Sequence, residues 1–193
     1  MLYKNRKKYA PFEIGLATFF SKISKNANFW TLLSLIFAVA AAYLITRQSF
    51  LFGGLFVAVS AMLDVVDGSI ARLYNKATNR GAYLDTVSDR YAEAIVIVAL
   101  VFVPLPSVIF PPAVWIAVLL FGSLMTTYAK ASASEKGLPT PLGVLLERAE
   151  RVFLIFIAVV LGHFGKVYMT YAIILLALLT NLSALQRVRM VLR

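Results

Sequence analysis

Six long apolar stretches constrain this chain more than any other feature of its sequence. They cover residues 28–46, 50–72, 82–104, 110–134, 144–162 and 167–188. A helix needs about 20 mostly apolar residues to cross the roughly 30 Å hydrocarbon core of a bilayer. Because lipid offers the backbone no water, such stretches must be helices or closed barrels. We therefore expect an all-α integral membrane protein with six transmembrane helices.

The composition agrees with a membrane protein. Of the 193 residues, 61% are hydrophobic and 15% are charged, whereas soluble domains are about 45–50% apolar and about 25% charged. This excludes a disordered chain, collagen, a coiled coil and a nucleic-acid-binding domain of ordinary composition. The sequence holds no cysteine, which excludes disulfides, a thiolate zinc site and a cysteine nucleophile.

The charges predict the orientation of the six helices. With six spans, both termini and the connections after the second and fourth helices share one side of the membrane. Only Arg47 and Lys166, of the 19 basic residues, fall on the other side. The positive-inside rule then places both termini in the cytoplasm. We expect a multi-pass protein of the cell membrane, with its active site facing the cytoplasm and with membrane lipids, not nucleic acid, as partners.

The chain has no visible boundary between domains. Residues 1–26 are basic and contain one short apolar run, at 11–20, which Lys22 and Lys25 follow. This is typical of an interfacial amphipathic helix on the cytoplasmic face rather than of a cleavable signal peptide. Residues 27–193 form the expected six-helix core. We therefore expect residues 1–193 to make a single membrane domain.

Four aspartates stand at the cytoplasmic ends of the second and third helices. Asp64 and Asp67 are three residues apart, and Asp85 and Asp89 are four apart. Both spacings put side chains on one helix face, so two antiparallel helices can point all four carboxylates at each other. Four such anions either have raised pKa values or are neutralised by cations, and carboxylate oxygens suit Mg²⁺, Mn²⁺ or Ca²⁺. The pattern predicts a one- or two-metal site that faces a phosphate-bearing substrate.

The aspartates alone are also consistent with roles different from phosphoryl transfer at a metal site. Asp64 and Asp67 by themselves fit a charge pair at a helix end. A cation transporter would use the four as an ion path, although both helices become apolar toward the outer side. A membrane phosphohydrolase would use the same metals with water in place of an alcohol.

The segment between the aspartate pairs completes a recognisable pattern. It reads Asp64-x2-Asp67-Gly68-x2-Ala71-Arg72-x8-Gly81-x3-Asp85-x3-Asp89. Glycines allow close approach of a ligand to the backbone, and Arg72 suits either binding of a phosphate or holding an aspartate in place. This pattern resembles the signature of the CDP-alcohol phosphotransferase (phosphatidyltransferase) family at every fixed position and spacing.

The resemblance implies a function and a role for each residue. The metal ligands would be Asp64, Asp67 and Asp85, with Asp89 beside them, and the cofactor would be Mg²⁺ or Mn²⁺, as two ions. Asp89 would also be the general base on an acceptor alcohol, which attacks the β-phosphorus of a CDP-lipid and releases CMP. The pocket for cytidine and pyrophosphate would be lined by Gly68, Ala71, Arg72 and Gly81. The resemblance also implies that this protein forms a homodimer.

The start of the first helix adds two candidates for binding the nucleotide. Ala27-Asn28-Phe29-Trp30-Thr31 resembles the Pro-Asn-x-x-Thr segment of family members, with alanine in place of proline. Asn28 and Thr31 are therefore expected at the CDP moiety. An N-cap at Asn28 and a packing role for Thr31 are the alternative.

A second basic cluster suggests the acceptor. Thr127, Lys130, Arg148 and Arg151 stand at cytoplasmic helix ends, and Arg90 follows Asp89. Cations at such positions bind either the acceptor's phosphate or lipid headgroups. The segments Tyr128-Ala129-Lys130 and Gly143-Val144-Leu145-Leu146-Glu147-Arg148-Ala149-Glu150-Arg151 resemble the phosphatidylinositol-phosphate and archaetidylinositol-phosphate synthase branch. That resemblance implies inositol 1-phosphate as acceptor and CDP-diacylglycerol or CDP-archaeol as donor. Glycerol 3-phosphate and serine are the alternative acceptors.

Overall fold

The computed structural model describes residues 6–74, 78–139 and 144–192, and side chains from Ile14 onward. Over these residues the chain is helical, and the expected all-α class is confirmed. The helices are α1 (Arg6–Ser21), α2 (Ala27–Thr46), α3 (Phe50–Leu73), α4 (Asn79–Ala99), α5 (Pro112–Glu135), α6 (Arg148–Phe164) and α7 (Lys166–Val191), with the 3₁₀ turn η2 (Leu100–Phe102) after α4.

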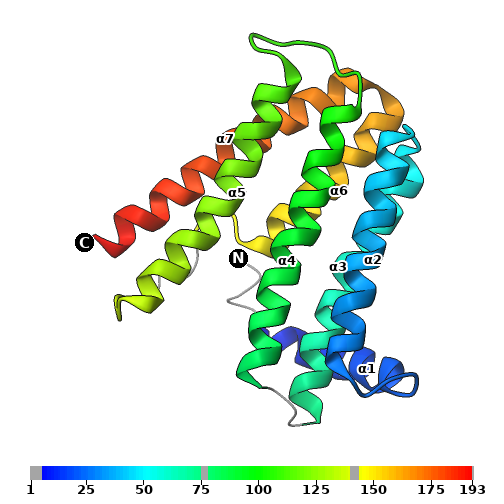
Figure 1. Ribbon diagram of the computed structural model, residues 1–193, viewed down its shortest axis with the longest axis vertical. Coiled ribbons are helices and arrows are strands. Elements are labelled where there is room, and N and C mark those ends of the chain that lie inside the picture. The colour runs from blue at the N-terminus through cyan, green and yellow to red at the C-terminus, as the bar shows by residue number, and fades with distance from the viewer. Residues whose placement is uncertain (1–5, 75–77, 140–143, 193) are drawn as a thin grey trace.

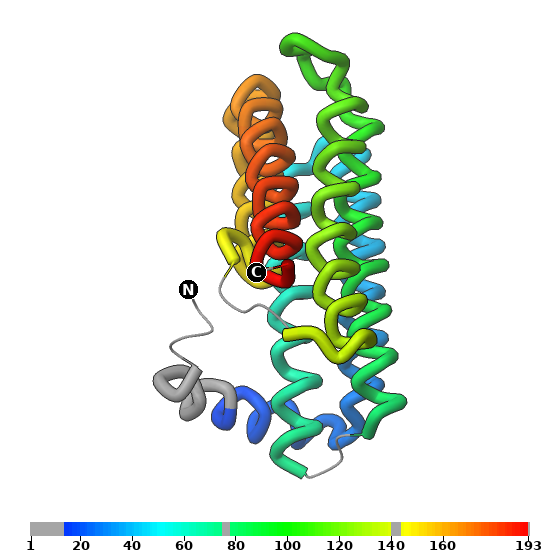
Figure 2. Tube along the Cα trace, turned by 90° about the vertical axis from the view of Figure 1, so that its left-hand side faces the viewer, coloured from blue at the N-terminus to red at the C-terminus, as the bar shows by residue number. Residues whose placement is uncertain are grey.

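Six helices run along the length of the molecule, and α1 lies across one end of them (Figures 1 and 2). α2 packs on α3 and α4, α3 packs on α6, and α7 packs on both α5 and α6. The main core joins all six through side chains such as Ile45, Ile97, Leu119 and Ile173. The long helices therefore hold their ends at fixed relative positions.

Four of the predicted spans satisfy length and composition together. α2, α3, α5 and α7 are long and apolar enough to cross a membrane. The third span was predicted at 82–104, but α4 ends at Ala99 and the 3₁₀ turn η2 follows it. α4 also carries charged residues over its first half, and α6 has only 17 residues. The sequence placed the fifth span at residues 144–162, but its helix begins at Arg148, because Glu147 and Glu150 form a capping box there.

Side-chain caps fix the starts of two helices near the aspartates. The Asn26 side chain accepts a hydrogen bond from Asn28 N at 3.1 Å, which caps α2. The alternative that Asn28 is the N-cap is therefore wrong. The Thr78 side chain caps α4 by accepting from Gly81 N at 3.0 Å. Of the positions named in the sequence motifs, Gly143 lies outside the described residues.

A helix is present where the sequence predicted an N-terminal one. α1 packs on α3, with Ala17 fully buried. Tyr74 Oη donates to Ser21 Oγ at 3.0 Å, and Trp30 Nε1 donates to Ser24 O at 3.0 Å. These bonds connect the end of α1, and the residues just after it, to the start of α2 and the end of α3.

α5 and α7 pack closely at Gly122. A Cβ at this position would lie 2.5 Å from Thr180 Oγ1 and 2.6 Å from Asn181 Nδ2. Asn181 Nδ2 in turn donates to Val118 O at 2.9 Å. Small residues commonly allow such close approach of helices in membranes, so Gly122 sets the distance between α5 and α7.

Gly122→Val is expected to destabilise the protein, because the added methyl groups overlap buried atoms of α7. Overpacking costs about 1–3 kcal/mol, and each kcal/mol lowers the melting temperature of a chain this size by about 2–4 °C. Thermal unfolding of the detergent-solubilised protein measures this. Gly15→Val is the matched control, since nothing lies within 4 Å of a Cβ there. An equal shift for both variants would contradict the packing role of Gly122.

Candidate active site

Three carboxylates converge where α3 and α4 approach each other. Asp64 and Asp67 come from α3 and Asp85 comes from α4, and one oxygen from each lies within 4.8 Å of the others. The spacing of three residues puts the two α3 carboxylates on one face, as expected. Asp67 is buried, with 3% of its surface exposed. The structure thus brings together three of the four predicted aspartates in one cluster, which we call the aspartate triad.

The aspartate triad suits a divalent metal. Its ligands would all be hard carboxylate oxygens, which Mg²⁺, Mn²⁺ and Ca²⁺ prefer. Thr31 Oγ1 donates a hydrogen bond to Asp67 Oδ2 at 2.6 Å, and such outer hydrogen bonds orient metal ligands. Each carboxylate offers about four lone-pair sites, so Asp67 keeps capacity for an ion. Thr31 therefore orients one carboxylate of the aspartate triad, and it also lines a neighbouring cavity.

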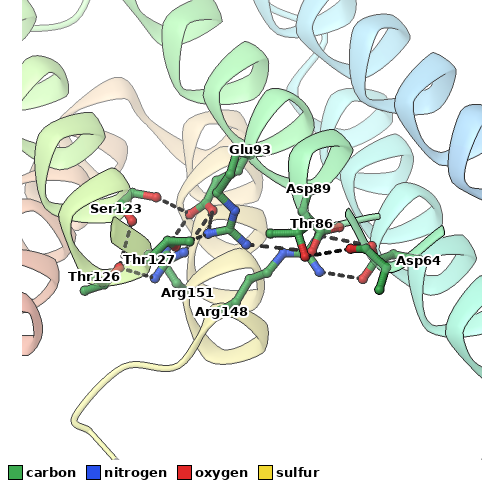
Figure 3. A network of polar contacts seen from close by, with 11 residues as sticks. Asp64, Thr86, Asp89, Glu93, Ser123, Thr126, Thr127, Arg148 and Arg151 are labelled. Atoms are coloured by element: carbon green, nitrogen blue, oxygen red, sulfur yellow. Dashed lines mark hydrogen bonds and ion pairs between the residues drawn. The ribbon is translucent and has the colours of Figure 1, made fainter. Parts of the chain in front are cut away.

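Asp89 lies one helical turn beyond Asp85 and is held by arginines. Arg148 Nη2 lies 2.6 Å from Asp89 Oδ1, and Arg90 Nη2 lies 3.7 Å from Asp89 Oδ2. Arg148 also donates to both oxygens of Asp64, at 2.6 and 3.1 Å. Figure 3 shows the Arg148 guanidinium between the two carboxylates. One arginine of α6 therefore joins the aspartate triad to the predicted general base.

A cavity of about 510 Å³, which we call the α2/α3 cavity, opens on one side of the aspartate triad. It includes all six residues predicted to bind the nucleotide. Its lining is Lys25, Asn26, Ala27, Asn28, Thr31, Asp67, Gly68, Ala71, Arg72, Thr78, Gly81, Ala82 and Asp85. The predicted nucleotide-binding residues of α2, α3 and α4 therefore surround one cavity, and Asp67 and Asp85 of the aspartate triad form part of its wall.

Gly81 shows why a small residue is needed at this wall. A Cβ there would lie 3.1 Å from Thr78 Oγ1 and 3.9 Å from Asn28 Oδ1. The Thr78 hydroxyl would have to shift, although it caps α4. A larger residue would also extend toward the cavity that both side chains line.

A second cavity of about 500 Å³, the α5/α6 cavity, opens on the Asp89 side. It contains all four residues predicted to bind the acceptor. Its lining is Thr86, Asp89, Arg90, Thr126, Thr127, Lys130, Ala131, Ser134, Glu147, Arg148, Arg151 and Arg187. Arginine and lysine outnumber carboxylates in this wall, so the α5/α6 cavity favours an anionic ligand.

Sequence reasoning missed Arg187 and Glu93, whereas Arg90 was noted beside the basic cluster because it follows Asp89. Arg187 is buried, and its Nη2 contacts Glu147 Oε2 at 3.1 Å. Arg187 was expected only as a cytoplasmic charge, because no motif surrounds it. Its polar neighbours Gln186 and Arg189 are typical of an ordinary helix end, so the sequence gives no signal that marks it as a site residue. Arg90 contacts Thr127 and Glu93, and Glu93 is buried beside Arg151.

An apolar groove of about 520 Å³, which we call the α3/α6 groove, opens beside Asp64 and Arg148. Side chains such as Val57, Ala61, Val152, Phe153 and Phe156 form its walls. Its polar end carries Asp64, Lys130, Glu147, Arg148 and Glu150. The groove thus joins the carboxylates to the apolar flank of the helices.

These features define a class of protein: a helical protein with four helices apolar enough to cross a membrane and, between two polar cavities, a carboxylate cluster suited to a divalent metal. Such an arrangement suits phosphoryl transfer, whose catalysis is mostly positioning and charge neutralisation.

The family model for CDP-alcohol phosphatidyltransferase matches residues 25–183. The chain belongs to this family, and it is a transferase.

Two relatives from curated proteins carry related functions. The "Bifunctional IPC transferase and DIPP synthase" of Aquifex aeolicus is 34% identical over 149 residues, which cover 72% of this chain and 32% of that protein. The chain therefore spans about a third of that relative. The "Archaetidylinositol phosphate synthase" of Methanothermobacter thermautotrophicus is 29% identical over 167 residues, covering 86% of this chain and 83% of that protein.

Solved structures share the fold. The phosphatidylinositol phosphate synthase of Mycobacterium tuberculosis with CDP-DAG bound has a TM-score of 0.79 at 24% identity, covering 93% of this chain and 92% of that one. The same protein in complex with manganese and citrate has a TM-score of 0.81 at 24% identity, covering 93% and 88%. At this identity the likeness shows the helical arrangement alone.

Thr31→Val is expected to weaken metal binding by about 10–100-fold, the usual effect of removing an outer hydrogen bond to a ligand. The substitution is nearly isosteric and removes the donor to Asp67. Isothermal titration with Mn²⁺ measures the affinity directly. Thr18→Val is the control, because its hydroxyl bonds only to Ile14 O on an exposed face. Unchanged Mn²⁺ affinity in Thr31→Val would refute the role of Thr31.

Proposed function

We propose that this enzyme transfers the phosphatidyl-type group of a CDP-lipid to inositol 1-phosphate and releases CMP. One observation carries the proposal: the cavity that holds the family's nucleotide residues and the cation-lined α5/α6 cavity adjoin the same group of carboxylates. A phosphate-bearing acceptor fits the second cavity because arginines bind phosphate in bidentate fashion. The relative named archaetidylinositol phosphate synthase supports this choice.

Glycerol 3-phosphate is the second candidate acceptor, because it too presents a phosphate to the α5/α6 cavity. Serine fits less well, since it would leave the cations Lys130, Arg151 and Arg187 of that cavity without a phosphate to bind. The α5/α6 cavity therefore favours a phosphorylated alcohol as the acceptor, and inositol 1-phosphate is the proposed member of that class.

The chemistry assigned to the chain begins at Asp89. Its carboxylate accepts the proton of the acceptor hydroxyl, and that oxygen attacks the lipid-side phosphorus of the CDP-lipid. The new P–O bond forms as the bond to CMP breaks, so CMP leaves with the electron pair. Arg148 holds Asp89 through the 2.6 Å contact, which fixes the base between the two substrates.

The aspartate triad is proposed to hold two Mg²⁺ or Mn²⁺ ions, with Asp89 adjacent. When bound, such ions neutralise the pyrophosphate and polarise the phosphorus under attack. Arg72, which lines the α2/α3 cavity and donates to Ser69 Oγ at 3.1 Å, is placed to bind a phosphate oxygen. The manganese in the mycobacterial structure supports a divalent ion in this fold.

The lipid part of the donor is assigned to the α3/α6 groove. Its apolar walls suit alkyl chains, and its polar end reaches Asp64 of the triad. The donor is CDP-diacylglycerol or CDP-archaeol, since both present the same headgroup and apolar chains. Entry from the side would keep those chains in the bilayer throughout.

We further propose that residues 1–193 form one membrane domain that crosses the membrane six times and assembles as a homodimer. In this topology α4 and α6 cross together with the four more apolar helices, and α1 lies at the cytoplasmic interface. The distribution of basic residues supports cytoplasmic termini and a cytoplasmic site. Shielding of the charges of α4 by α3, α5 and α6 would make its crossing tolerable.

The acceptor is tested by CMP release from the purified protein with CDP-diacylglycerol and Mg²⁺. Inositol 1-phosphate is expected to support release, whereas unphosphorylated inositol, its matched control, is expected to be at least tenfold poorer. The reason is that only the phosphate engages the arginines of the α5/α6 cavity. Equal rates with both compounds would contradict a phosphate-binding role for that cavity.

Asp89→Asn is expected to lower the rate of CMP release by about 100-fold or more, since a general base contributes about 10²–10⁴-fold. Binding of the CDP-lipid is expected to stay within threefold of the wild type, because Asp89 does not line the α2/α3 cavity. Equilibrium binding of CDP-diacylglycerol separates the two effects. Normal turnover by Asp89→Asn would assign the base to another group.

A further inference from the structure

Glu93 is a buried carboxylate to which the proposed chemistry gives no role. It lies on α4, one helical turn beyond Asp89, and is 6% exposed. It belongs neither to the aspartate triad nor to the signature pattern of residues 64–89. A buried carboxylate is costly unless it is paired, so its contacts indicate what it does.

Those contacts are concentrated on Arg151. Arg151 Nε donates to Glu93 Oε1, and Arg151 Nη2 donates to Glu93 Oε2 at 2.9 Å. Ser123 Oγ donates to Glu93 Oε1 at 2.7 Å. Figure 3 shows the Glu93 carboxylate between the side chains of Ser123 and Arg151. Glu93 therefore holds one side of the guanidinium in a two-point contact, which fixes its plane.

A third bond fixes the other end of the guanidinium. Arg151 Nη1 donates to Thr126 Oγ1 at 3.1 Å. An arginine has five N–H donors, and the three bonds to Glu93 and Thr126 leave one N–H on each terminal nitrogen. Arg151 also lines the α5/α6 cavity. The remaining N–H bonds are thus the ones that a ligand of that cavity can engage.

Glu93 also acts on a second cation of the same cavity. Arg90 Nη1 lies 3.5 Å from Glu93 Oε2, and Arg90 donates to Thr127 Oγ1. Both arginines line the α5/α6 cavity, whereas Glu93 does not. Glu93 therefore stands behind the cavity wall and contacts two cations that form it.

Stability alone accounts poorly for this arrangement. Replacing a buried ion pair with apolar residues of similar volume is often neutral or stabilising. A fixed cationic geometry is what a planar guanidinium offers to a phosphate. Placement of Arg151 and Arg90 for an anion thus accounts for the network better than packing does.

We propose that Glu93 is a positioning residue, which holds Arg151 and Arg90 in the orientation that binds the phosphate of the acceptor. This inference rests on the proposed function of the α5/α6 cavity. It predicts that Glu93 affects the acceptor and leaves the CDP-lipid and the metal unaffected, because neither the α2/α3 cavity nor the aspartate triad includes it.

The first test is Glu93→Gln in the full chain, with separate KM values for the two substrates. The amide cannot accept from both Arg151 nitrogens, so the KM for inositol 1-phosphate is expected to rise about tenfold or more, the loss of one strong charge-assisted contact. The KM for CDP-diacylglycerol and the Mn²⁺ affinity are expected to stay within twofold. Glu93→Asp, which keeps the charge, is expected to restore part of the loss.

A double-variant cycle tests whether Glu93 acts through Arg151. Arg151→Lys cannot make the two-point contact, so adding Glu93→Gln to it is expected to raise the acceptor KM by less than the same substitution does in the wild type, with the remaining rise due to Arg90. Additive effects of the two substitutions would overturn the proposal. Glu135→Gln is the matched control, because Glu135 is exposed at the end of α5, and it is expected to change neither KM.

Ser123→Ala provides a milder variant if Glu93→Gln does not fold. It removes only the 2.7 Å bond to Glu93 and is expected to raise the acceptor KM about threefold, on the scale of one ordinary hydrogen bond. An unchanged acceptor KM, or an equal rise in both KM values, would overturn the role of Glu93. Absence of acceptor-dependent CMP release in the wild type would instead overturn the proposed function.

Discussion

The ion pairs made by Arg148 are the interaction on which the rest of the site depends. α3 and α4 carry four aspartates to one end of an otherwise apolar bundle, where like charges repel each other strongly. Arg148 contacts both Asp64 and Asp89 at 2.6 Å. Because this arginine is the first residue of α6, the start of that helix must lie level with the carboxylates. The capping box of Glu147 and Glu150 fixes it there.

This arrangement places two polar cavities on either side of one carboxylate cluster. The α2/α3 cavity contains Asp67 and Asp85 of the triad, and the α5/α6 cavity contains Asp89 and Arg148. Two substrates held in these cavities would meet at the carboxylates without a covalent enzyme intermediate. Much of the catalysis would then come from holding both reactants in the correct geometry, which is a large effect in itself.

The sequence predicted the helices and most of the site because both depend on local spacing. The signature spacings place Asp64, Asp67 and Asp85 on facing sides of two helices. The pairing of Arg148 with two aspartates, and of Arg151 with Glu93, could not be predicted. Those contacts join residues 58–84 positions apart, and they depend on how α6 packs against α3 and where this leaves its arginines relative to α4. Arg187 was missed for the same reason.

The most direct test follows the acceptor oxygen with an isotope. Inositol 1-phosphate labelled with ¹⁸O at its hydroxyl groups is incubated with CDP-diacylglycerol and the enzyme, and both products are analysed by mass spectrometry. Attack on the lipid-side phosphorus predicts that all of the label stays in the lipid product and that CMP is unlabelled. Attack on the nucleotide-side phosphorus would instead give a labelled cytidylyl ester of inositol phosphate together with phosphatidate, and this would contradict the account. In a parallel reaction in ¹⁸O-labelled water, CMP released together with labelled phosphatidate would also contradict it, because water would then be the acceptor.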